Sequence, residues 1–173
     1  MIFRIIERKI RHDREEIEGG LTPAQRKLPA VVTVHVVIGV SLLAANLIAG
    51  VWGGTAWLGR RASVGFWYAL RVAQATVVLQ VMIGLILVFL GHVTVDLHYL
   101  YGALPLLVSF LAELTRVGAA QQELGELDFE SLDQARQQEV ALAILRREMG
   151  IMAVACLVIF FLALRAAGTT PLI

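Results

Sequence analysis

Four long stretches of mainly apolar residues follow one another along the chain, separated by short segments rich in glycine or charge. They run over residues 29–50, 66–90, 95–117 and 149–166. An α-helix needs about 20 consecutive apolar residues to cross a lipid bilayer. The pattern therefore predicts an all-α fold in which residues 28–173 form a four-helix transmembrane bundle.

The fourth apolar stretch is short, but we expect the helix that contains it to be longer. Ser131 and Gln134 have the spacing of a capping box, and neither glycine nor proline interrupts residues 132–148. We therefore predict one helix over 132–166, whose membrane part begins at 149 and which projects beyond the bilayer. By the same kind of reasoning, Asp96 is expected to be the N-cap of the third helix.

The connections between the apolar stretches predict the topology. Residues 91–94 form a very short link, so the second and third helices are expected to be an antiparallel hairpin. Four crossings place both termini on the same side of the membrane.

The tail, residues 1–27, predicts an amphipathic N-terminal helix that lies in the membrane interface. One face would be apolar, with Ile2, Phe3, Ile6, Ile10 and Ile17. The other would be basic, with Arg4, Arg8, Lys9, Arg11 and Arg14. A solvated tail helix is the alternative. Because an anionic cytoplasmic leaflet attracts basic helices, we expect both termini on the cytoplasmic side of a bacterial cell membrane. Arginines at the opposite end of the bundle leave this orientation open.

The composition agrees with a membrane protein. Of the 173 residues 58 % are hydrophobic and 17 % are charged, whereas about a quarter of a soluble domain is charged. The net charge of +1 gives no indication of a nucleic-acid partner. The single cysteine, Cys156, excludes a disulfide within the chain and a cysteine metal cluster, and it is predicted to be a small core residue.

Two histidines are the candidates for chemistry. His35 and His98 lie near the starts of the first and third apolar stretches, so they are expected at similar depth on the same side, where they could face each other. Each is followed by glycine at i+4, Gly39 in HVVIG and Gly102 in HYLYG. A flat porphyrin needs a helix face without side chains, and these glycines would supply it. We therefore predict a b-type haem with His35 and His98 as metal ligands, although small residues also promote plain helix packing.

Other polar residues carry weaker expectations. Arg26, Lys27 and Arg165 are expected on the histidine side, as partners of haem propionates or as ordinary interfacial anchors. His92 is a rival ligand or a loop residue, and His12 is expected to be solvated. Gln80 and Asn46 are predicted to make hydrogen bonds between helices.

The stretch from His35 to about Leu106, which includes LQVMIGLILVFLGHVTVDLHYLYGALPLL, resembles one four-helix half of the haem A synthase family. That family has two such halves, each with a pair of histidines on alternate helices. The resemblance implies a membrane bundle that binds haem. Val32 stands where the family often has a glutamate before its first histidine, which departs from the family's pattern and leaves open whether the chain is an enzyme.

Two functions therefore remain open. The first is a membrane haem protein in electron transfer or respiratory-chain assembly, with the bilayer and possible membrane complexes as partners. The second is a cofactor-free accessory or assembly subunit of a larger membrane complex. No nucleophile or acid–base pair in the sequence indicates an enzyme that acts alone.

Overall fold

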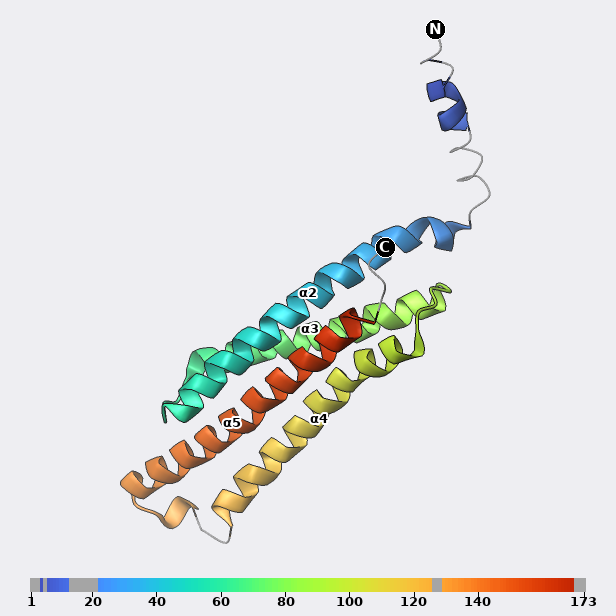
Figure 1. Ribbon diagram of the computed structural model, residues 1–173. Coiled ribbons are helices and arrows are strands. Elements are labelled where there is room, and N and C mark those ends of the chain that lie inside the picture. Colours follow the sequence, from blue (N-terminus) through green and yellow to red (C-terminus); the bar gives the residue numbers. More distant parts are fainter. Residues whose placement is uncertain (1–3, 5, 13–21, 126–128, 170–173) are drawn as a thin grey trace.

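The computed structural model describes residues 4, 6–12, 22–125 and 129–169, and no strand occurs among them. The long helices are α2 (Pro23–Leu58), α3 (Val64–Phe89), α4 (Asp96–Leu124) and α5 (Gln134–Ala167), with a short 3₁₀ helix, η1 (Phe129–Ser131), before α5 (Figure 1). The predicted all-α fold is confirmed. All four long helices are long and apolar enough to cross a membrane, which is compatible with an integral membrane protein.

The first long helix extends further than predicted. The expected end at residue 50 is wrong, because α2 continues through Gly53 to Leu58. Gly53 approaches α3 so closely that a Cβ atom there would lie 2.4 Å from the Phe66 ring. This glycine therefore serves the packing of α2 on α3 and does not end the helix.

Both predicted N-caps are wrong by one or two residues. The N-cap of α5 is Asp133, whose carboxylate accepts a hydrogen bond of 2.8 Å from the backbone N–H of Arg136. Ser131 cannot take that place because it ends η1. The N-cap of α4 is Val95, and Asp96 is the first helical residue. With 34 residues, α5 is about 51 Å long, and a bilayer core is about 30 Å thick.

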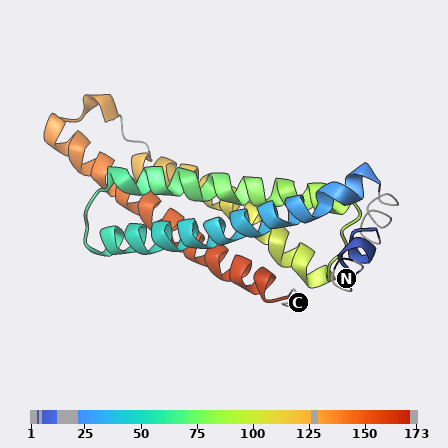
Figure 2. The ribbon, with the colours of Figure 1, turned by 90° about the horizontal axis from the view of Figure 1, so that it is seen from above.

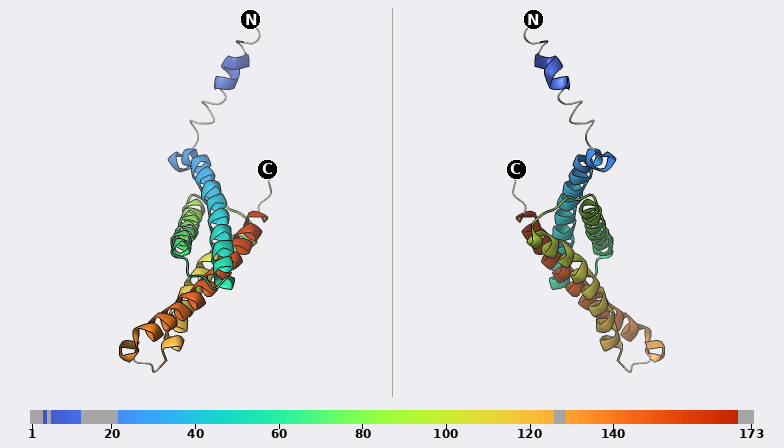
Figure 3. Two further views of the ribbon diagram at one scale, coloured as in Figure 1. Left: turned by 90° about the vertical axis from the view of Figure 1, so that its left-hand side faces the viewer. Right: turned by 90° about the vertical axis from the view of Figure 1, so that its right-hand side faces the viewer.

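The four long helices pack in the order α3, α2, α5, α4. Helix α2 contacts both α3 and α5, and α4 packs along α5. The short connection makes α3 and α4 antiparallel as predicted, and Gly91 permits the turn with a φ of 81°. Yet α3 and α4 contact each other little. Figure 3 shows α3 lying beside α2, while α4 lies against α5.

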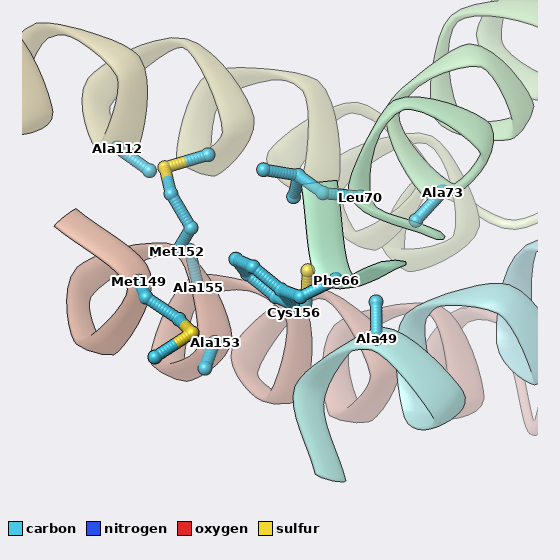
Figure 4. Close-up of a cluster of buried hydrophobic side chains, with 10 residues drawn as sticks. All are labelled: Ala49, Phe66, Leu70, Ala73, Ala112, Met149, Met152, Ala153, Ala155 and Cys156. Carbon is cyan, nitrogen blue, oxygen red and sulfur yellow. The ribbon is translucent and has the colours of Figure 1, made fainter. Parts of the chain in front are cut away.

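The main core lies at the end of the bundle where α2 connects to α3. Its buried residues are Ala49, Phe66, Leu70, Ala73, Ala112, Met149, Met152, Ala153, Ala155 and Cys156 (Figure 4). The Cys156 thiol is free and only 2 % exposed, so the prediction of a core residue is confirmed. Beyond this core α4 and α5 extend past the α2–α3 connection (Figure 2).

A cluster of charged and polar residues links α3 to α4 at the end of the bundle that contains the main core. Glu113 of α4 accepts from Arg71 at 3.1 Å and from Gln74 at 2.7 Å, both on α3. Arg116 pairs with Glu113 at 2.8 Å and with Glu148 of α5 at 3.6 Å. These bonds join three helices where apolar packing between α3 and α4 is thin.

Large apolar side chains are exposed on the outer faces of all four helices, for example Val40, Val72, Phe110 and Phe161. Such faces are compatible with contact to lipid. In the tail, residues 6–12 are helical and their side chains are exposed, Ile6 and Ile10 included. The predicted apolar-face residues Ile2, Phe3 and Ile17 lie outside the described residues.

Candidate functional site

The two histidines meet inside the bundle, as the sequence analysis expected. His35 of α2 and His98 of α4 have ring centroids 6.2 Å apart, and their ring planes are tilted by 55°. They lie at the end of the bundle that holds the α3–α4 connection, away from the main core. Helices α2 and α4 are not neighbours in the packing order, so these two rings bridge across the interior.

His35 is tied to α3. Its Nε2 lies 3.1 Å from the Gln80 side-chain amide nitrogen, which confirms the prediction that Gln80 bonds between helices. Two buried atoms of this pair, His35 Nδ1 and Gln80 Oε1, have no hydrogen-bond partner within the described part of the chain. The matching prediction for Asn46 is wrong, because its amide donates to Leu42 O one turn earlier on the same helix.

Two glycines let α2 and α3 approach each other at this contact. A Cβ atom on Gly39 would lie 3.0 Å from the Gln80 amide nitrogen, and one on Gly84 would lie 3.5 Å from His35 Cε1. Each helix therefore places a glycine opposite the polar side chain of the other. Gly39 makes room for the Gln80 amide. In this structure it therefore does not provide the open helix face that was predicted for a porphyrin.

His98 is tied to α5. Its Nδ1 lies 3.1 Å from Ala166 O, and Thr169 Oγ1 lies 3.5 Å from the same nitrogen. A carbonyl oxygen only accepts, so this contact places a proton on Nδ1 and leaves the lone pair on Nε2. At Gly102, one turn later on α4, an added Cβ would meet no atom of another helix within 4 Å among the described residues. That side of α4 therefore has open space beside His98.

Comparison with protein families, curated proteins and solved structures finds no match.

The other candidate residues lie at different distances from the pair. Arg165 precedes the residue that His98 contacts, and its guanidinium carbon lies 5.7 Å from the centroid of the Tyr101 ring. Arg26 and Lys27 are exposed near the start of α2, and His92 is half-buried in the α3–α4 connection. His12 is exposed in the tail. Sequence reasoning missed the Ala166 carbonyl, because a backbone acceptor has no signature in residue type.

The separation of the two ring centroids matches that of two imidazoles on a shared metal. When imidazole nitrogens lie about 2 Å from a metal on opposite sides, the ring centres are about 6 Å apart. The His35–His98 separation of 6.2 Å agrees with this. The Gln80 amide nitrogen can only donate, so His35 Nε2 accepts from it and the unpartnered Nδ1 carries the ring proton. The Nε2 of His98 holds a lone pair, because its Nδ1 donates to Ala166 O. The described residues hold no group of three or more side chains suited to a metal ion, but an axially ligated haem needs only two.

Proposed function

We propose that this chain is a membrane protein that holds a b-type haem between His35 and His98 and serves electron transfer or respiratory-chain assembly. The observation that carries the proposal is the histidine pair itself. Two imidazoles from different helices lie at the separation that a shared metal requires, and one of them has a buried nitrogen without a partner. A buried polar atom in a membrane is costly unless something binds it.

Residues of α4 and α5 would each have a separate role in binding the haem. His98 would present Nε2, since Ala166 O holds the proton on Nδ1. The space beside Gly102 would admit the edge of the macrocycle, and Arg165 at the same end would neutralise a propionate. When bound, a b-type haem supplies one-electron transfer, with a potential set by its ligands and its burial. The resemblance of the stretch from His35 to Leu106 to half of a haem A synthase supports the same reading.

The test is a reduced-minus-oxidised absorption spectrum of the protein purified in detergent from haem-replete cells, with extracted haem quantified. We expect close to one haem per chain in the wild type. His35→Ala and His98→Ala should each lose the haem band, because each removes an axial ligand. His92→Ala is the matched control and should keep the haem. A colourless wild-type protein, or haem retained in both ligand variants, would contradict the proposal.

A second function is favoured by a different observation. Both histidines already make contacts between helices, His35 with Gln80 and His98 with Ala166 O. Such contacts suit a cofactor-free accessory or assembly subunit of a larger membrane complex. In that case His35→Ala would lower the yield or assembly of the bundle with no spectral consequence. Thermal unfolding of the wild type and variant, measured beside their spectra, separates the two functions.

We further propose that both termini face the cytoplasm of a bacterial cell and that the basic tail lies on the membrane surface. The start of α2 and the end of α5 lie at the same end of the bundle (Figure 1). A cysteine introduced at Glu7 or at Ser131, in a Cys156→Ala background, reports which side it is on. We expect an impermeant maleimide added outside the cell to label the Ser131 position. Labelling at Glu7 would reverse the orientation.

A further inference from the structure

Among the described residues, Gln80 is the one whose side chain lies within hydrogen-bonding distance of the His35 ring. It projects from α3, and Gly39 leaves just enough space for its amide against α2. A polar side chain kept in this position inside a membrane helix needs a reason beyond packing, because an apolar residue would fill the space at lower cost.

The contact decides which nitrogen of His35 is available. A histidine that binds a metal uses one ring nitrogen and usually gives the proton on the other nitrogen to a protein acceptor. For His98 the protein acceptor is Ala166 O. For His35 the occupied nitrogen is Nε2, beside the Gln80 amide, and the vacant one is Nδ1.

The amide of glutamine offers both an acceptor oxygen and a donor nitrogen. In the described arrangement the amide nitrogen faces Nε2 and donates to it, so the ring proton sits on Nδ1, where it would oppose a metal. A half-turn of the amide about its last torsion exchanges the nitrogen and the oxygen; the oxygen then accepts from Nε2–H, and Nδ1 carries a lone pair. Only the second arrangement leaves His35 ready to bind iron.

We infer that Gln80 is the positioning residue of His35: after a half-turn of its amide, which exchanges the nitrogen now beside Nε2 for the oxygen, that oxygen accepts the Nε2 proton and Nδ1 is presented to the haem iron. This inference rests on the proposed haem function. In this arrangement the two proposed ligands are alike, because His35 and His98 each donate one ring N–H to a protein oxygen. It also explains why glycine stands at residue 39, where a larger residue would displace the amide.

The experiment compares Gln80→Glu and Gln80→Met with Gln74→Met, the matched control. Gln74 is the other glutamine of α3, and it bonds to Glu113 at the far end of the bundle. Each protein is purified with haem, and its midpoint potential, its electron paramagnetic resonance spectrum and its rate of haem transfer to an apo-globin are measured. Thermal unfolding of the haem-free proteins reports on folding separately.

We expect Gln80→Glu to keep its haem and to shift the midpoint potential in the negative direction, because a carboxylate is a stronger acceptor and makes the imidazole more basic. Gln80→Met should shift the potential in the positive direction and weaken haem retention by about 10- to 100-fold. Gln74→Met should leave the potential and the paramagnetic spectrum as in the wild type.

Three outcomes would overturn the inference. If Gln80→Met matches Gln74→Met in potential, spectrum and haem retention, Gln80 does not position the ligand, and the haem proposal stands without it. If Gln80→Glu and Gln80→Met shift the potential in the same direction, the amide donates its hydrogen bond and the proton assignment is wrong. A wild-type protein that takes up no haem removes the inference together with the proposed function. If Gln80→Met does not fold, the direction in which Gln80→Glu shifts the midpoint potential still decides whether the amide accepts or donates.

Discussion

The segments His35–Gly39 and His98–Gly102 share the pattern His-x-x-x-Gly, yet the fold uses them differently. On α2 the glycine lies against the Gln80 amide, and the histidine lies against Gly84 of α3. On α4 the histidine contacts the backbone of α5, and no other helix in the described part of the chain comes within 4 Å of a Cβ added at Gly102. The first segment is closed by a neighbouring helix, whereas the second faces open space.

The difference shows that a glycine one turn after a histidine has two physical meanings. It can let a neighbouring helix approach, or it can leave room for something that is not protein. Packing density separates these meanings, because only a filled site resists an added side chain. If the bundle binds a flat cofactor, the cofactor lies beside Gly102 and not beside Gly39.

Replacing Gly39 with leucine should have the largest effect. An added Cβ would start 3.0 Å from the Gln80 amide nitrogen, so a leucine must push that amide away and separate α2 from α3. Overpacking of this kind costs about 1–3 kcal/mol. We expect lower yield, a lower melting temperature in detergent and loss of haem together, measured by size-exclusion chromatography and thermal unfolding. A Gly39→Leu protein that melts like the wild type would show that the α2–α3 contact is loose.

Gly102→Leu is the matched change on the other segment, and we expect it to separate folding from binding. The leucine enters open space, so the melting temperature of the haem-free protein should stay within a few degrees of the wild type. The haem content measured by extraction should fall, because the side chain occupies the space beside His98. Normal haem content in this variant would place the cofactor elsewhere or remove it.

The pairing of the histidines could be predicted, but the partners of each ring could be predicted only in part. Depth in the membrane follows from position along an apolar stretch, which is why His35 and His98 were expected to meet. Gln80 was recognised as an interhelical residue because an amide in lipid needs a partner. The sequence did not identify that partner as His35, since this depends on the rotation of α3 about its own axis.

Helix packing, which the sequence pattern does not determine, also explains which predictions of the fold were wrong. A short connection predicts that α3 and α4 are antiparallel, but it does not predict how far they separate along their length. That separation follows from α2 and α4 both packing on α5. The predicted cap of α5 was wrong because Ser131 ends η1, so that Asp133 is the residue whose side chain accepts from the backbone N–H of Arg136.

Thr169→Val should have the smallest effect and tests how His98 is held. Thr169 Oγ1 donates to Ala166 O at 2.6 Å, whereas its distance to His98 Nδ1 is 3.5 Å, too long for a strong bond. If Ala166 O alone fixes the ring, removing the hydroxyl should change stability by less than about 1 kcal/mol and leave the haem spectrum as in the wild type. Unfolding in detergent and the reduced absorption spectrum measure both quantities. A shifted spectrum would instead make the hydroxyl a second partner of His98, so that the proposed α4 ligand would depend on a side chain, as His35 depends on Gln80.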